Sequence, residues 1–367
     1  MTRVWVRLSA LPTWAICTIV MIVAAAYRVA LLATTFTHLD ADQAIVGLMA
    51  FHIQAGDRPV FFYGQPYQGS AEAYGAALCF HLFGAGAWTA RLPTLLFSIA
   101  FVGAVYWLGR LLYGPYIAGL TALFLALGPA ILISASTACG FGYIEVMVCG
   151  TVLFLLISRY PDLRIMPIPI GLVCGLLIGF GLWTQPLMAE YVIPAGVALA
   201  ARLWRGDGGG RGIALSLGAL LLGTVLGAAP LLADNLSRHW ETISYLTART
   251  PGGNHLLTVG RLLTEALPVL TGLVTPTAVP SLFARLVDVH RLWYVVGLIC
   301  GLGIVARLAL GPRNIFRRIA AILDQPRGSG SGTSSQTGGS PGDGILALFV
   351  LSCLLFFVGS NFGAARA

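Results

Sequence analysis

The stretch LDADQAIVGLMAFHIQAGDRPVFFYGQPYQGSAE, residues 39–72, is the longest polar interval in the first half of the chain. It lies between two strongly apolar segments. It holds four of the 14 acidic residues of the chain, namely Asp40, Asp42, Asp57 and Glu72. The same stretch contains the aromatic run FFYGQPY, which suits a membrane interface or the wall of a pocket. A solvated loop would explain the acids but not the aromatic run, so we interpret this stretch as a functional loop.

The composition around this loop is that of a membrane protein. The chain has 367 residues, of which 57% are hydrophobic and 10% are charged, whereas soluble domains carry about 25% charged residues. Apolar runs of about 20 residues recur, and this is the length that crosses a bilayer. The first run is long enough to span and shows no small-residue cleavage site, so we expect an uncleaved helix rather than a signal peptide.

About nine apolar segments are expected to cross the membrane. They are Pro12–Leu32, Ala87–Leu112, Pro115–Ser134, Gly142–Ser158, Ile165–Trp183, Pro186–Leu203, Ile213–Ala233, Leu292–Leu310 and Ile345–Val358. Asp42–Gly56 and Ala71–Phe83 have helical spacing of apolar residues but are too short to span, so we expect them to lie in the interface. The predicted fold class is therefore an all-α polytopic membrane protein with interfacial helices in its first outer loop.

The basic residues set the expected orientation. All 22 are arginines, and they fall in short clusters in alternate loops. The positive-inside rule places these loops in the cytoplasm if the N-terminus is cytoplasmic. Most of the acidic residues, with the 39–72 loop, then lie outside, so we expect outward-facing chemistry at a bacterial plasma membrane. The net charge of +8 reflects topology and anionic lipid rather than a nucleic-acid partner.

Several motifs in about the first 235 residues resemble those of membrane glycosyltransferases of the GT-C fold. They are LDADQA after the first helix, AGDRPVFFYGQPYQGSAEAY, the block GAGAWTARLPTLLFSIAFVGAVYWLGRLLYGPY, and GFGYIE before a later helix. The order and spacing of these motifs are most similar to those of glycosyltransferase family 39, which includes protein O-mannosyltransferases and the lipid A aminoarabinose transferase. Members commonly carry Asp-Glu in the first loop. The matching pair here is Asp42-Gln43, so the second acid is missing.

The resemblance also implies a domain organisation. Residues 1–324 are expected to form one transmembrane glycosyltransferase-like domain, with a catalytic first outer loop at 35–86 and another outer loop at 234–291. Within the latter, Val259–Leu273 and Val279–Val289 are semi-apolar and are expected to be interfacial or re-entrant. Residues 325–344 are rich in Gly and Ser and are expected to be a flexible cytoplasmic linker. Residues 345–367 would be a last transmembrane segment, and the chain is expected to be truncated relative to the family.

The implied activity is inverting transfer of a sugar from a polyprenyl-phosphate carrier to an acceptor hydroxyl at the outer membrane face. The acceptor is a lipid, a glycan or a protein. An ionised Asp can take the proton of the acceptor hydroxyl. Asp42 is the candidate catalytic base because it matches the family acid. Asp40 is the alternative, in which case Asp42 would orient it. Asp42 is also a candidate helix N-cap, since Asp is favoured there.

Four charged residues are candidates for binding the substrate. Glu145, in GFGYIE, is predicted to face a pocket, and the alternative is an interfacial acid solvated at the end of its helix. Glu72 belongs to the same predicted site. Arg58 and Arg91 are candidates for meeting the departing phosphate, because the planar guanidinium group matches phosphate oxygens. The alternative for Arg91 is an anchor to lipid headgroups.

Three residues of the aromatic run, Tyr63, Gln65 and Tyr67, complete the predicted substrate site. The tyrosines would stack on a sugar ring, and interfacial aromatic residues are the alternative. A divalent cation held between the loop carboxylates is a further expectation. No zinc site is predicted, because the histidines lack metal-ligand spacing.

Two other functions remain open from the sequence. A lipid or sugar transporter, or flippase, would place ionisable groups near the middle of its helices, whereas the acids here cluster in loops. A non-catalytic scaffold with the same fold is the other alternative, because the second acid of the first loop is missing.

Overall fold

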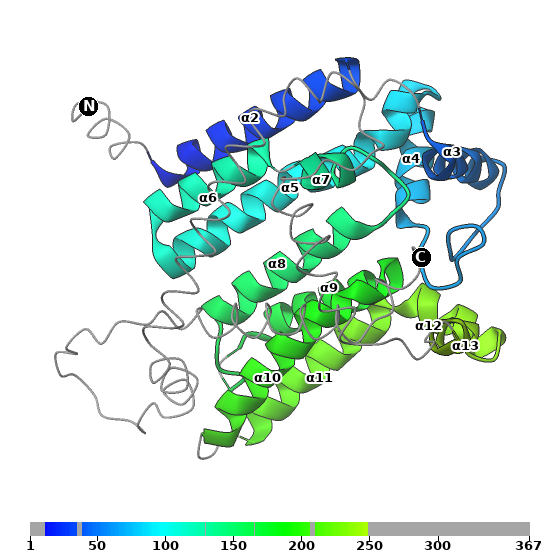
Figure 1. Ribbon diagram of the computed structural model, residues 1–367. Coiled ribbons are helices and arrows are strands. Elements are labelled where there is room, and N and C mark those ends of the chain that lie inside the picture. Colours follow the sequence, from blue (N-terminus) through cyan, green and yellow to red (C-terminus); the bar gives the residue numbers. More distant parts are fainter. Residues whose placement is uncertain (1–11, 35–38, 129, 165, 206–209, 249–367) are drawn as a thin grey trace, which may run out of the picture.

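The computed structural model describes residues 12–34, 39–128, 130–164, 166–205 and 210–248, and this part of the chain is helical apart from its connections (Figure 1). The helices are α2 (Thr13–Thr34), α3 (Ala41–Gln54), α4 (Ala71–Phe83), α5 (Ala87–Tyr113), α6 (Pro115–Leu127), α7 (Ala130–Ala135), α8 (Tyr143–Arg159), α9 (Ile168–Thr184), the 3-10 turn η1 (Pro186–Met188), α10 (Ala189–Arg205), α11 (Gly210–Gly227), α12 (Ala229–Ser237) and α13 (Glu241–Ala248). The expected spans at 292–310 and 345–358, the pieces at 259–273 and 279–289, and the linker at 325–344 lie outside the described residues.

Three helices in the described part, α2, α5 and α11, are long and apolar enough to cross a membrane, and α6 and α9 are shorter apolar helices. This composition supports an integral membrane protein. Each expected span that falls on described residues coincides with a helix, but two of these spans are broken. The segment expected as Pro115–Ser134 is divided into α6 and α7, because Gly128 ends α6 with φ of +28° and a proline follows. The segment expected as Ile213–Ala233 is divided into α11 and α12.

A further difference concerns the second outer loop. Asp234 was expected to begin a polar loop, but it lies inside α12, Ala229–Ser237. The short helices α12 and α13 follow α11 directly and carry polar residues on the side that faces the first loop. The boundary prediction was therefore wrong at this point, because a polar helix after a span has no apolar run to reveal it.

The bundle has two groups of packed helices. Helices α2, α5 and α6 share a core that includes Val20, Val102 and Ala122. Helices α8, α9 and α10 share a second core that includes Leu153, Cys174 and Tyr191. Helices α5 and α8 make the contact that joins the two groups.

Glycines allow α9 and α11 to pack with their backbones in contact. A side chain at Gly175 of α9 would place its Cβ 2.1 Å from the carbonyl oxygen of Leu220, and one at Gly223 of α11 would meet the carbonyl oxygen of Leu172 at 2.2 Å. Small residues spaced four apart are a common means of close helix packing in membranes. This contact fixes the end of α9 that reaches the functional loop.

The short helices gather at one end of the bundle. Helices α3, α4, α12 and α13 lie at that end, together with the blue loop that joins α3 to α4 (Figure 1). Helix α3 exposes Leu48 and Phe51, and α4 exposes Leu78 and Leu82, which fits the interfacial position expected for them. The ends of α5 and α8 that carry Arg110 and Arg159 lie at the other end of the bundle.

Candidate active site

The loop between α3 and α4, residues 57–70, is pinned to the end of α9. The Trp183 Nε1–H donates a hydrogen bond to the carbonyl oxygen of Val60 (3.0 Å), and the Gly69 N–H donates to the carbonyl oxygen of Thr184 (3.1 Å). A Cβ on Gly69 would lie 2.6 Å from the Trp183 carbonyl oxygen, so only glycine permits this close approach. Both arms of the loop are therefore held by a helix from the other group of the bundle.

Two buried carboxyl groups meet next to this loop. Glu72 lies in the first turn of α4 and Glu145 in the first turn of α8, and they are 7% and 0% exposed. Glu72 accepts hydrogen bonds from the Gly140 N–H and from the Thr94 Oγ1–H (3.2 Å). Neither oxygen of Glu145 accepts a hydrogen bond from the described residues. The interpretation of Glu145 as a solvated interfacial acid is therefore wrong, because its carboxyl group has no contact with solvent.

The electrostatics of the pair follow from this burial. Burial raises the pKa of Glu72, and the hydrogen bond from the Gly140 N–H opposes that shift. Glu72 and Glu145 act on each other electrostatically, and two adjacent buried carboxyl groups do not both ionise. A proton held by one of them supplies the donor that Glu145 otherwise lacks. The neighbouring thiol of Cys139 has its pKa raised to about 12 by burial and by the charge of Glu72, so it is not a nucleophile at neutral pH.

Asp40, not Asp42, caps helix α3. Its Oδ1 accepts the Gln43 backbone N–H and its Oδ2 accepts the Gln43 Nε2–H, both at 2.8 Å. The prediction of Asp42 as the N-cap is wrong because the helix already begins at Ala41, which puts Asp42 inside the first turn. The extended ψ angle of −179° that Asp40 adopts is what lets its side chain reach back to the helix.

Gln43 links this cap to Arg91. The Arg91 Nε–H donates to Gln43 Oε1 at 2.6 Å. Because arginine only donates, the carbonyl end of the amide must face Arg91 and its NH2 must face Asp40. Gln43 and Arg91 are 5% and 3% exposed, so the interpretation of Arg91 as a lipid-headgroup anchor is wrong. Gln43 thus joins a buried cation to the helix cap.

The remaining predicted residues lie at the same end of the bundle but in different settings. Asp42 is half-buried, and a Cβ on Gly140 would lie 3.3 Å from its carbonyl oxygen. The segment of Asp42 is therefore packed against the loop that binds Glu72. Gln65 is half-buried at the tip of the 57–70 loop, whereas Arg58 is exposed.

The two tyrosines of the aromatic run have partners within the chain. The Tyr63 hydroxyl is 2.8 Å from His52 Nδ1. The ring of Tyr67 stacks on Tyr245 of α13, with centroids 5.4 Å apart. The structure thus brings the segment of Asp42, Glu72 and Glu145 together, and places the exposed Tyr63 and Arg58 outside this buried group.

Arg28 is a buried residue that sequence reasoning overlooked. It is 1% exposed within α2. Its NH1 donates to the carbonyl oxygen of Ala126 (2.8 Å) and its Nε to Ser136 Oγ (3.0 Å). Its NH2 donates to the carbonyl oxygen of Leu125 (3.3 Å). Leu125 and Ala126 lie in the last turn of α6, so Arg28 satisfies carbonyl groups that the break after α6 leaves open. An ionisable residue inside an apolar span was the available signal.

Metal ligands are not grouped in the described residues, where no cluster of three or more His, Cys, Asp or Glu side chains is arranged to hold an ion. Glu72 and Glu145 supply two carboxyl groups, but fewer than the six to eight oxygen ligands that calcium takes. The expected divalent cation therefore stays a prediction without a ligand set among these residues.

The structural comparison supports the GT-C fold for this all-helical bundle, in which short helices and buried acids lie at one end. The chain is similar to the crystal structure of ArnT from Cupriavidus metallidurans in the apo state, with a TM-score of 0.50 and 15% sequence identity. The match covers 98% of this chain and 59% of that chain. No protein-family model and no curated protein matches the sequence. At this identity the likeness shows the fold, and the activity follows below as a proposal.

Proposed function

We propose that this protein is an inverting membrane glycosyltransferase that moves a sugar from a polyprenyl-phosphate carrier to an acceptor hydroxyl of a lipid, glycan or protein. The bilayer in question is a bacterial plasma membrane, with the N-terminus cytoplasmic and the site outward. The observation that carries the proposal is the meeting of Glu72, Glu145 and the Asp42 segment at one end of a GT-C bundle. Buried carboxyl groups at such an end need a function, because their desolvation is costly.

Asp42 is the proposed catalytic base. Its carboxylate accepts no hydrogen bond from the described residues, whereas both oxygens of Asp40 accept bonds from Gln43. Asp42 takes the proton of the acceptor hydroxyl, the acceptor oxygen forms a bond to the anomeric carbon, and the bond to the carrier phosphate breaks on the opposite face. Asp40 then serves the reaction indirectly, by holding the start of α3.

The departing phosphate carries negative charge that the site must stabilise. In this proposal exposed Arg58 contacts the phosphate directly. Buried Arg91 contributes its positive charge from within, and Gln43 orients it. In this proposal Glu72 and Glu145 bind the sugar or the acceptor after the site opens, because both carboxyl groups are buried in the structure. Tyr63, Gln65 and Tyr67 form the proposed sugar-binding wall above them.

Transfer activity tests this proposal. Membranes containing the protein are incubated with a panel of radiolabelled polyprenyl-phosphate hexoses and pentoses, with and without added divalent cations. We expect Asp42→Asn to lose about 10²-fold or more of the transfer rate, while the matched acid Asp57→Asn, which is exposed on the same loop, keeps it. Full activity in Asp42→Asn removes the base from this position. Movement of the label across the bilayer without transfer would favour the transporter instead.

Topology is a separate test of the same proposal. Cysteines introduced at Gln65 and at Gly208, in a background without other cysteines, should react with an impermeant reagent from opposite sides of the membrane. Reaction of both from the outside contradicts the orientation and removes the outward site.

A further inference from the structure

The elbow between α12 and α13 has an unusual backbone. Its residues His239 and Trp240 have φ angles of +53° and +62°. Non-glycine residues seldom adopt this region, and for a bulky residue such as Trp it is an outlier. Such a conformation persists only where surrounding contacts over-determine it, and it often marks a functional position. The contacts that hold this elbow therefore indicate what it does.

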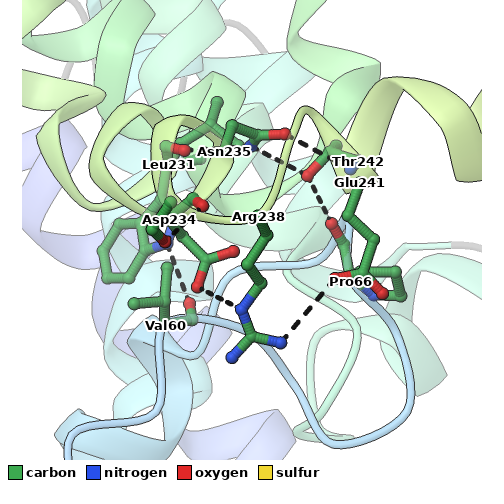
Figure 2. Close-up of polar contacts among 10 residues, drawn as sticks. Val60, Pro66, Leu231, Asp234, Asn235, Arg238, Glu241 and Thr242 are labelled. Carbon is green, nitrogen blue, oxygen red and sulfur yellow. Dashed lines mark hydrogen bonds and ion pairs between the residues drawn. The ribbon is translucent and has the colours of Figure 1, made fainter.

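A buried pair of side chains closes the elbow (Figure 2). Asn235 Oδ1 accepts the backbone N–H of Thr242 (3.2 Å), and Asn235 Nδ2 donates to Thr242 Oγ1 and to the Leu231 carbonyl oxygen, both at 2.9 Å. Thr242 is the second residue of α13, so its N–H is one of those a helix start leaves unsatisfied. Asn235 thus caps α13 from the preceding helix.

Ion pairs brace the exposed side of the same elbow. Arg238 Nε lies 3.1 Å from Asp234 Oδ1, and Arg238 NH1 lies 3.7 Å from Glu241 Oε2 (Figure 2). The Arg238 side chain is 62% exposed, and exposed ion pairs contribute little. The buried Asn235–Thr242 pair is therefore the main determinant of the elbow.

The Thr242 hydroxyl of this pair donates its hydrogen atom to the loop between α3 and α4. Asn235 Nδ2 can only donate, so the Thr242 hydroxyl must accept from it. The single proton of that hydroxyl then points to the carbonyl oxygen of Pro66, 2.6 Å away. One turn along α13, Tyr245 stacks on Tyr67. Helix α13 thus holds the tip of the 57–70 loop by one polar and one aromatic contact.

We propose that Asn235 and Thr242 are positioning residues that hold the 62–67 tip of the loop, with Gln65 and Tyr67, in place to bind the polyprenyl-linked sugar. This assignment rests on the proposed function. The arms of the loop are pinned independently at Val60 and Gly69 by α9. Loss of the Thr242 hydroxyl therefore loosens the tip, which keeps its aromatic contact, without releasing the arms, so the variants are expected to fold.

The test compares Thr242→Val, which keeps the shape of the side chain but has no hydroxyl, with Thr242→Ser, which keeps the hydroxyl. Thr18→Val is the matched control, because the exposed Thr18 hydroxyl donates to the backbone carbonyl oxygen of Trp14 in its own helix α2 (2.9 Å). Transfer is measured with the donor of the panel that gives the highest rate. Hydrogen exchange followed by mass spectrometry reports the loop tip independently of activity.

We expect Thr242→Val to raise the KM for the donor about 10-fold, the effect of one lost hydrogen bond, while kcat changes by less than about threefold. Amide exchange at Gln65 and Gln68 should increase by about tenfold in the same variant. Thr242→Ser and Thr18→Val should behave as the wild type in both measurements. An effect on kcat alone would contradict a role in binding.

The two measurements separate the possible failures. Unchanged exchange in Thr242→Val overturns the assignment, because the hydroxyl then does not hold the tip. Faster exchange with an unchanged KM also overturns it, because the tip is then held for another purpose. A wild-type protein that transfers no sugar removes the proposed function, and the positioning role falls with it, whatever the exchange shows.

Discussion

The assignment of Asp40 as a structural cap and Asp42 as a carboxylate without a hydrogen bond from the described residues predicts losses of stability of different size for two acids that are two residues apart. Asp40→Ala loses the N-cap, which costs about 1 kcal/mol. It also leaves the buried Gln43 Nε2–H without its acceptor, which costs roughly 1–3 kcal/mol. We therefore expect Asp40→Ala to lower the free energy of unfolding by about 2–4 kcal/mol. Asp42→Ala loses only an interaction with the helix dipole, worth about 0.3–1 kcal/mol.

Asparagine at the two positions sharpens the comparison. Asp40→Asn can still cap the helix, but its NH2 group would face the Gln43 NH2 group. Either the two donors oppose each other or Gln43 turns its NH2 group towards Arg91, so we expect a loss of about 1–3 kcal/mol. Asp42→Asn should be nearly silent in stability.

Unfolding in mixed detergent micelles, followed by far-ultraviolet circular dichroism, measures all four variants. The reasoning is refuted if Asp40→Ala is as stable as the wild type, or if Asp42→Ala is the less stable of the two. The same series is a control for the activity assay. If Asp40→Asn loses both transfer activity and stability, the loss of activity is explained by a displaced α3 and not by the loss of the catalytic base.

Three further predictions follow from the packing and the buried charges. Gly223→Ala should separate α11 from α9 and lower the thermal unfolding midpoint, because its Cβ would lie 2.2 Å from a backbone oxygen of α9. The control is Gly218→Ala in the same helix, where a Cβ would have nothing within 4 Å. This variant should stabilise the protein by up to about 1 kcal/mol. Because burial raises the pKa of Glu72, the folded protein keeps a proton that the unfolded chain loses above about pH 4.3. The free energy of unfolding should therefore fall as the pH rises from there through the raised pKa, and Glu72→Gln should reduce this slope in pH-dependent unfolding curves. Arg28→Met should cost roughly 1–3 kcal/mol, since the buried carbonyl oxygens at the end of α6 lose their donor; a midpoint equal to that of the wild type would contradict the role of Arg28 at the α6–α7 break.

The sequence by itself determined the elements, because helix formation and membrane insertion depend on local runs of residues. The interfacial helix expected at Ala71–Phe83 has those bounds in the structure. The span expected at Gly142–Ser158 differs from α8 by one residue at each end. The sequence also predicted which segment holds the candidate site, because acidic residues in an apolar chain need a polar environment. The predicted boundaries were wrong where the span expected at Pro115–Ser134 breaks at Gly128. They were also wrong where α12 begins after Gly227, although Pro230 at its start marks a new helix.

Only the tertiary structure decided which side chains meet. Glu72 and Glu145 belong to helices far apart in the sequence, and their contact depends on the packing of α4 and α8 around Gly140. The cap of α3 depends on the backbone angle of one residue, which placed Asp40 rather than Asp42 at the helix start. Arg91 was expected at the surface because its position along the helix is near an end, but its burial depends on which face α5 turns towards Gln43. No local pattern encodes these pairings, because the geometry of helix packing sets them.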